Sequence, residues 1–456
     1  MHQFLMPSPY DDDIVRPLGL IASLLIAATA CVPTASTASP APTSTSSAVP
    51  TGSAPATPLE GLAARPVGAK GGVARHWYTV PDGLFHEDAR VGITIPNVDA
   101  APGRPRARLR STGRSIDLTL AGASQWVGVQ PLDGTAVGEQ TVDFIVRLRD
   151  GTDAVIDTTT FMLSAPEYVV WTLDFEGDAA TNAALDNTSA IANSFSIPMT
   201  LMWNPRVWTT TQVSGERADA MLKWTMNIAN TGYAEVALHI HAWTDFVRAA
   251  GVTPRVSPSW ASRGDGYDVP LTAFTEAETK QLIDHALTLM SDHAMPRPTS
   301  FRGGGLFANA ANLRAVAAAG FTVDTSATPS GDFGQLALPW SLPRDAQPYR
   351  PSRDDASVPG DLPLLEVPNI AGNTYGLTAF SIQRVINDDR AMLAPSGSPA
   401  TQKRALTLVS HPATIDATER AAIEALFRAF DPYRYDRDAG PLRFVTLAEL
   451  ARSYSR

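Results

Sequence analysis

The sequence is almost free of cysteine. One cysteine, Cys31, occurs among 456 residues, so no disulfide can form within the chain and a metal site built from cysteine thiolates is excluded. Clusters of Lys and Arg are also lacking, and the formal net charge is -10 at pH 7. Because nucleic-acid backbones require a basic protein surface, we exclude nucleic acid as a partner. We expect a monomeric protein.

An apolar run near the N-terminus, residues 18–30, is too short for a comfortable transmembrane helix but has the length of a secretory signal core. The small residues 28–30 before Cys31 resemble the end of a bacterial lipoprotein signal, in which the cysteine becomes the lipidated first residue. The resemblance implies a signal peptide over residues 1–31, export to the cell envelope or the extracellular space, and a membrane tether through lipidated Cys31. The alternative is an ordinary cleaved signal that ends near residue 30 and frees the protein.

Two segments of contrasting composition follow. Residues 32–75 are rich in Pro, Ser, Thr and Ala and have few large apolar side chains, which predicts a disordered linker. Residues 76–165 contain short alternating apolar runs with turn signals between them, which predicts a small all-β sandwich domain. Because His, Asp and Glu do not gather there, we assign this domain an accessory role as a spacer or a surface-binding module.

Strand and helix patterns alternate from residue 166 to residue 456. The apolar run 169–173 is followed by a predicted helix near residues 187–195, and the run 199–203 by one around residues 217–227. Alternating βα units predict a parallel sheet. Roughly seven such units predict an α/β fold, a distorted (β/α)7-type barrel preceded by the β-sandwich domain.

The strand at residues 235–243 carries two histidines. His239 and His241 are two residues apart, so both side chains leave the strand on the same face. They are a candidate pair of metal ligands, and the alternative is a pair of hydrogen-bonded core histidines.

Other polar residues follow further predicted strands. Because the carboxyl ends of parallel barrel strands converge on one mouth, we expect these side chains to meet. They are Asp174, Glu176 and Asp178 after one strand, His239 and His241 at the end of another, Arg302 after a third, and His411 after the last long one. Two histidines and a carboxylate are a common catalytic ligand set for zinc or a related divalent ion, a second carboxylate can act as general base, and a further histidine can act as general acid.

Several short motifs resemble those of the polysaccharide deacetylases, carbohydrate esterase family 4. They are Thr172-Leu-Asp-Phe-Glu-Gly177, Glu235-Val-Ala-Leu-His239, Phe301-Arg302-Gly-Gly and Leu408-Val-Ser-His411, with weaker likenesses at residues 197–202 and 444–449. The resemblance covers about residues 168–451. It implies a distorted (β/α) barrel that removes acetyl groups from amino sugars with a divalent metal, for which we expect Zn²⁺.

Carried over to this sequence, the resemblance implies a role for each site residue. These roles are Asp174 as general base, Arg302 as its charge partner, His411 as general acid, and Glu176, His239 and His241 as metal ligands, with Asp178 as the alternative carboxylate ligand. The histidine motif is not the standard one, because the family's second histidine lies four residues after the first, where this chain has Trp243.

These residues lead to an expected function. The chain is expected to be a hydrolase of carbon–nitrogen amide bonds that deacetylates an N-acetylated envelope or extracellular polysaccharide. Trp203 and Trp243 are candidates for stacking on sugar rings, and packing in the core is the alternative. Two other functions stay open: hydrolysis of a non-sugar amide or an O-acetyl ester on the same barrel, and glycan binding without turnover.

Overall fold

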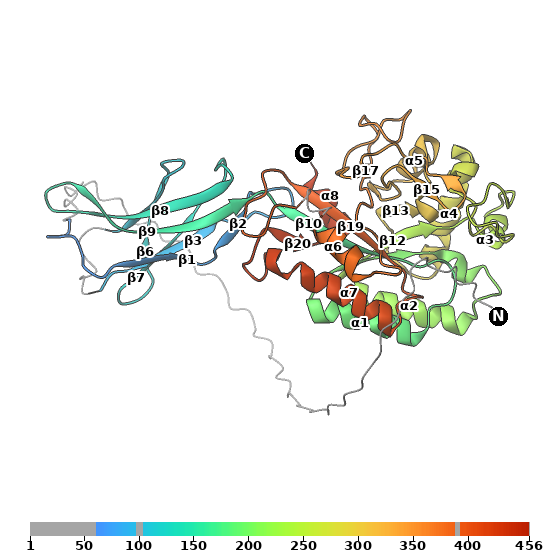
Figure 1. Ribbon diagram of the computed structural model, residues 1–456, viewed down its shortest axis with the longest axis horizontal. Helices are drawn as coiled ribbons and strands as arrows, with labels where there is room; N and C mark the ends of the chain where they lie inside the picture. The colour runs from blue at the N-terminus through green and yellow to red at the C-terminus, as the bar shows by residue number, and fades with distance from the viewer. Residues whose placement is uncertain (1–60, 97–103, 388–392, 456) are drawn as a thin grey trace, which may run out of the picture. The chain divides into compact units, whose positions relative to one another are not determined.

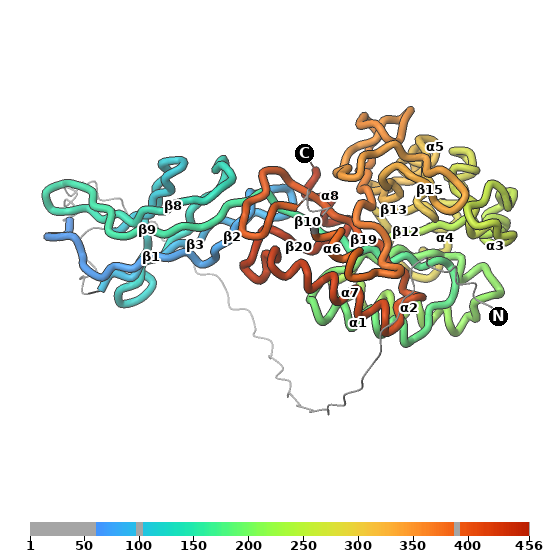
Figure 2. Tube along the Cα trace, in the orientation of Figure 1, coloured from blue at the N-terminus to red at the C-terminus, as the bar shows by residue number. Residues whose placement is uncertain are grey.

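The computed structural model describes residues 61–96, 104–387 and 393–455 (Figures 1 and 2). The predicted signal peptide, Cys31 and the linker up to residue 60 lie outside these ranges. Within them, no helix is both long enough and apolar enough to cross a membrane. The described residues form one compact unit, so the separate folding of residues 76–165 stays a prediction.

Two β-sheets precede the parallel sheet in the chain. The first has the strand order β1-β3-β7-β6 and the second β2-β9-β8-β4-β5. Their strands are β1 (Lys70–Val73), β2 (Trp77–Thr79), β3 (Ala89–Thr94), β4 (Arg106–Leu109), β5 (Ser115–Asp117), β6 (Thr119–Leu120), β7 (Gln125–Gln130), β8 (Gly138–Arg147) and β9 (Asp153–Ser164). Both sheets contribute side chains to one hydrophobic cluster, for example Val91 and Phe144. Alternating burial, as along β3, follows from the period of two of a strand with one face in this cluster.

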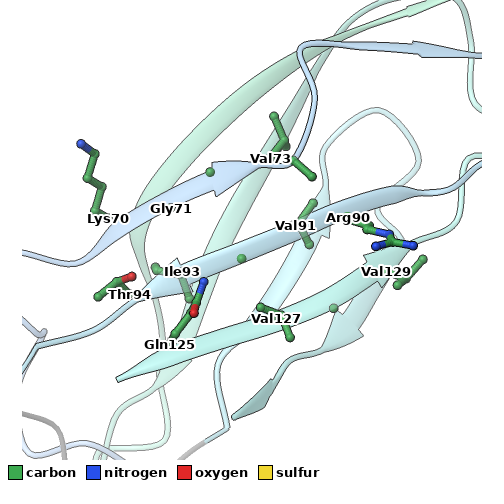
Figure 3. A pocket seen from close by; sticks show the side chains of 14 residues that line it. Lys70, Gly71, Val73, Arg90, Val91, Ile93, Thr94, Gln125, Val127 and Val129 are labelled. Atoms are coloured by element: carbon green, nitrogen blue, oxygen red, sulfur yellow. The ribbon is translucent and has the colours of Figure 1, made fainter. Parts of the chain in front are cut away.

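A shallow pocket lies over β1, β3 and β7 (Figure 3). The residues that line it include glycines and valines but no His, Asp or Glu. The residues that line this pocket therefore offer no carboxylate or imidazole as a metal ligand.

The parallel sheet runs in the order β17-β14-β13-β12-β11-β10-β19-β18, with β20 beside the start of β10. Its nine strands are β10 (Glu167–Asp174), β11 (Met199–Trp203), β12 (Ala234–Ile240), β13 (Ser300–Gly303), β14 (Val323–Asp324), β17 (Leu365–Glu366), β18 (Gly372–Asn373), β19 (Arg404–Ser410) and β20 (Leu442–Phe444). The predicted α/β class with a parallel sheet is confirmed. The sheet curls into a half-barrel that ends at β17 and β18, so the pairing is more open than the predicted barrel of seven βα units.

The open edge of the sheet is made of very short strands. β14, β17 and β18 have two residues each, and no α-helix lies between β14 and β17. A loop region replaces it, with the small hairpin of β15 (Asp332–Phe333) and β16 (Leu336–Ala337). This edge of the sheet thus consists of two-residue strands joined by loops.

Helices occupy most of the other connections. They are α1 (Asn182–Phe195), α2 (Gly215–Ala229), α3 (Thr244–Ala249), α4 (Glu276–Asp292), α5 (Ala310–Ala318), α6 (Ala379–Asn387), α7 (Ala417–Ala429) and α8 (Leu447–Ser453). Several begin at a side chain that accepts a hydrogen bond from the first turn, such as Thr181, Ser214 and Thr275. These caps satisfy backbone donors that have no partner within the helix.

The central strands of the parallel sheet are buried on both faces. All eight residues of β10 and all five of β11 are buried, and Trp171, Leu201 and Phe301 belong to one large hydrophobic cluster. Continuous apolar runs are typical of strands that are covered on both sides. This rigid core fixes the positions of the side chains at the carboxyl ends of the strands.

Two carboxyl groups lie side by side at the edge of the core. Asp324 in β14 and Glu366 in β17 are register partners, and both are fully buried. Burial, reinforced by the charge of Asp324, raises the pKa of Glu366 well above its usual value, and burial raises the pKa of Asp324 as well. The folded protein therefore holds a proton on this pair at pH values where the unfolded chain has released it.

This shared proton makes stability depend on pH. As pH rises from the ordinary glutamate pKa towards the raised one, the folded state binds more protons than the unfolded state, so stability falls. The slope for one proton is at most about 1.4 kcal/mol per pH unit. We expect Glu366→Gln to flatten this profile, as measured by urea unfolding from pH 5 to 9. The same substitution at the exposed Glu216 is the control, and an unchanged slope in Glu366→Gln would contradict the shared proton.

Candidate metal centre and active site

The predicted site residues come from the carboxyl ends of four strands. β10 ends at Asp174, β12 carries His239 and leads into His241, β13 carries Arg302, and β19 leads into His411. His239 and Arg302 are register partners on adjacent strands. The structure brings these four strand ends together, and all five side chains are buried.

Glu176 lies at the centre of three imidazole rings. Its Oε1 is 3.0 Å from Nε2 of His411, and its Oε2 is 3.8 Å from Nε2 of His239 and in direct contact with Nε2 of His241. Ligand atoms of Glu176, His239 and His241 lie within 4.8 Å of one another, as do those of Asp174, Glu176 and His411. Both groups are compact enough to surround one ion.

The two histidines of β12 are oriented by backbone carbonyls. Nδ1 of His239 is 3.1 Å from the carbonyl oxygen of Arg302, and Nδ1 of His241 is 2.8 Å from that of Tyr267. A carbonyl oxygen can only accept, so each Nδ1 carries the proton and each Nε2 presents a lone pair when the ring is neutral. Such outer hydrogen bonds fix the tautomer and the ring orientation of metal-binding histidines.

The charges around Glu176 are strongly coupled. Burial favours the neutral carboxyl, but the nearby His241, with His239 and His411, outweighs it and the pKa of Glu176 is lowered. Burial opposes the charged form of His241 and of His411, yet Glu176 outweighs it and the pKa of each imidazole is raised. The cluster thus favours a negative carboxylate with positive charge around it.

Arg302 holds the second carboxylate of the site. The guanidinium is 0% exposed, and its Nη1 donates to Oδ1 of Asp174 over 2.6 Å and to Thr172 over 2.8 Å. Its remaining nitrogens donate to the carbonyl of Thr325 over 3.0 Å and to Asn369 over 2.7 Å. A buried, charge-assisted pair of this kind keeps the Asp174 side chain in one place.

The other predicted residues lie elsewhere. Asp178 is exposed and belongs to neither candidate ligand group. Trp203 and Trp243 are buried in the hydrophobic cluster and do not line the pocket at the site, so the structure brings neither of them to a position for stacking on a sugar. Trp203 packs against Phe175 instead, with ring centroids 5.1 Å apart.

A pocket opens onto the cluster, and loops supply its aromatic side. Asp174, Glu176, His241 and His411 line it on one side. Trp260, Tyr267 and Phe333 also line it, and the Tyr267 ring stacks on His241 with centroids 4.2 Å apart. Sequence reasoning missed these aromatic residues because residues 251–270 and 329–361 lack any periodic pattern, and their only signal was aromatic side chains in loops rich in Gly and Pro.

No protein-family model and no curated protein matches the chain. Solved structures that match include a protein from Mycobacterium smegmatis assigned to the polysaccharide deacetylases, with 14% identity, 63% of this chain and 89% of that chain covered, and a TM-score of 0.38. A family 4 carbohydrate esterase from Streptomyces lividans, in complex with acetate, is 11% identical, with 62% of this chain and 94% of that chain covered and a TM-score of 0.32. A family 4 acetyl xylan esterase from Clostridium thermocellum, in complex with a cobalt ion, is 14% identical, with 62% of this chain and 89% of that chain covered and a TM-score of 0.31.

These structures belong to the family that the sequence motifs resemble, carbohydrate esterase family 4. At such identities and TM-scores, we base the function on the residues of the site.

Proposed function

We propose that the chain is a hydrolase dependent on a divalent metal, Zn²⁺ by preference, that removes acetyl groups from an N-acetylated cell-envelope or extracellular polysaccharide. The observation that carries the proposal is the convergence of three imidazole Nε2 atoms on the buried carboxylate of Glu176, beside the Arg302–Asp174 pair.

The donor set fits a divalent ion. Nε2 of His239 is buried and has no hydrogen-bond partner among the described residues, and it lies 3.8 Å from Oε2 of Glu176. The lone pairs of the imidazole nitrogens and of the carboxylate repel one another unless a proton or a metal ion lies between them. Glu176, His239 and His241 would hold the ion, which leaves open positions as in catalytic zinc sites. When bound, the ion would polarise a carbonyl oxygen and lower the pKa of a water.

The chain's own residues divide the remaining chemistry. Asp174 accepts the proton of the attacking water, because the hydrogen bond from the buried Arg302 holds its carboxylate in place. His411 lies on the other side of Glu176 and donates a proton to the departing amine. Its Nδ1 has no hydrogen-bond partner in the described part of the chain, so this ring is less constrained than those of His239 and His241.

The direct test is acetate release from a panel of substrates by purified protein with its metal content measured. We expect release from an N-acetylglucosamine polymer with about one equivalent of Zn²⁺ and loss of release after chelation. Acetylated xylan and a small acetanilide in the same panel distinguish the ester and non-sugar amide alternatives. Binding of the polymer without release from any substrate would support a glycan-binding protein and contradict the proposal.

The pocket makes Trp260 the aromatic residue to test for substrate binding. Its ring stacks on Phe307 with centroids 5.4 Å apart and 9° between planes, and it lies edge-on to Phe333 at 5.5 Å. We expect Trp260→Leu to raise KM roughly two- to tenfold with little change in kcat, since aromatic contacts contribute about 0.5–1.5 kcal/mol. Trp208→Leu, away from the pocket, is the control, and an unchanged KM in Trp260→Leu would exclude this contact.

Export and tethering belong to the same proposal. The apolar run 18–30 before the only cysteine supports a lipid anchor on Cys31, with residues 32–75 as a linker and residues 76–165 as an accessory domain that spaces or docks the catalytic part. Metabolic labelling with a fatty acid tests the anchor: wild type should be labelled and Cys31→Ala should not. Labelling of both proteins would contradict it.

A further inference from the structure

The turn that carries Glu176 is held from outside the site by two side chains. The indole Nε1 of Trp243 donates to the carbonyl oxygen of Glu176 over 2.9 Å. Nη1 of Arg206 donates to the next carbonyl, that of Gly177, over 2.8 Å. Gly177 has φ +83° and so turns the chain sharply behind Glu176. Both carbonyls of this turn therefore have fixed partners.

Arg206 is a buried cation, and each of its three guanidinium nitrogens donates a hydrogen bond. Its side chain is 1% exposed, and its Nε and Nη2 each donate to Asp245 over 2.8 Å. Nη2 also donates to Gln212 over 2.8 Å. The planar fork of the guanidinium matches a carboxylate in this bidentate way, which fixes its orientation.

Trp243 and Arg206 also form a cation–π contact. The guanidinium carbon of Arg206 lies 3.6 Å from the centroid of the Trp243 ring. A cation over the face of an indole is attracted by its π electrons, and more strongly where water is excluded. The buried Arg206 and Trp243, with the partly exposed Asp245, form one unit, called here the Arg206 clamp. Arg206 and Trp243 each donate one hydrogen bond to a carbonyl of the Glu176 turn.

We propose that the Arg206 clamp positions Glu176 as a metal ligand. Trp243 lies four residues after His239, where the resembled family has its second histidine, and it supports the metal site by its hydrogen bond to the Glu176 backbone and not by binding the ion. Glu176 follows the end of β10 and has no strand partner, unlike His239, which lies within β12 and pairs with Arg302 of β13. Its carboxylate must stay beside His241 and His411, although the carboxylate of Asp174, two residues earlier in the chain, repels it. Fixing its backbone makes the ligand set ready for the ion. This inference rests on the metal site of the proposed function.

The test compares two identical substitutions. Trp243→Phe keeps a ring over Arg206 and removes the donor to Glu176, whereas Trp208→Phe removes an indole nitrogen that has no hydrogen-bond partner among the described residues. Zn²⁺ affinity is measured by competition with a chelator, and the melting temperature of the metal-free protein is measured beside it. Residues that orient metal ligands typically change affinity by about 10- to 100-fold, so we expect Trp243→Phe to raise the Kd for Zn²⁺ by about tenfold. Trp208→Phe should bind as wild type, and the two metal-free variants should melt at similar temperatures.

A second variant keeps the inference testable if Trp243→Phe does not fold. Asp245→Asn removes the charge that holds Arg206, and the Asp245 side chain is 31% exposed, so the substitution is tolerable. It should also raise the Kd. Equal Zn²⁺ affinities in wild type, Trp243→Phe and Asp245→Asn would overturn the role of the clamp. If wild type itself bound no Zn²⁺, the proposed metal site would fail instead, so the two failures are distinguishable.

Discussion

Asp174→Asn is expected to lower kcat by about 10²- to 10⁴-fold, the usual contribution of a general base. Asn has nearly the same shape and can still accept the hydrogen bond from Arg302, so the geometry of the site and the Zn²⁺ content should be retained, although the loss of the charge opposite Arg302 should lower the stability of the fold. What is lost is the negative charge that accepts a proton. Acetate release with metal content measured in the same samples separates the loss of a base from the loss of the ion.

Asp178→Asn is the matched control for Asp174→Asn. It makes the same chemical change four residues later, on an exposed side chain outside both candidate ligand groups. Its kcat should be close to that of wild type. Equal losses in the two variants, or full activity in Asp174→Asn, would contradict the assignment of the base.

Arg302→Met is expected to destabilise the protein by about 3–5 kcal/mol, the cost of removing one partner of a buried ion pair. The guanidinium donates to Asp174, Thr172 and Asn369 with no exposure to water, so its removal leaves a buried carboxylate without a counter-charge. Met fills a similar length, which limits the cavity. Urea unfolding measures the change.

Arg314→Met is the control for Arg302→Met. Arg314 pairs with Glu276 at the surface, where the side chains are 32% and 46% exposed. Exposed pairs contribute about 0–1 kcal/mol because water competes for both charges. If the two variants unfolded at the same urea concentration, the Arg302–Asp174 pair would not contribute the stability that its burial implies.

The assembly of the site could be predicted because it depends on strand ends. Asp174, His239, Arg302 and His411 lie at or just after apolar runs, and such runs are recognisable without knowledge of the fold. Parallel strands then bring their carboxyl ends to one edge whatever the connections are. The family resemblance favoured Glu176 over Asp178 as the ligand, but the strand pattern alone could not choose between them, because both follow the same strand and only the path of the turn separates them.

Other features depend on contacts that leave no pattern in the sequence. An aromatic residue beside a strand end can point into the pocket or into the core, and Trp243 is buried although it follows His241 by two residues. Trp260 and Tyr267 reach the site from a loop without periodicity. The two-residue strands β14, β17 and β18 are too short to produce an alternation, so the half-barrel could not be distinguished from a more complete barrel.

The most direct measurement of the central claim is a crystal structure of the Zn²⁺-loaded protein with anomalous diffraction at the zinc edge. We predict one ion bonded to Nε2 of His239, Nε2 of His241 and a carboxylate oxygen of Glu176, at the distances of about 2.0–2.2 Å usual for zinc. An ion bound elsewhere, or one that leaves either histidine without a bond, would contradict the account.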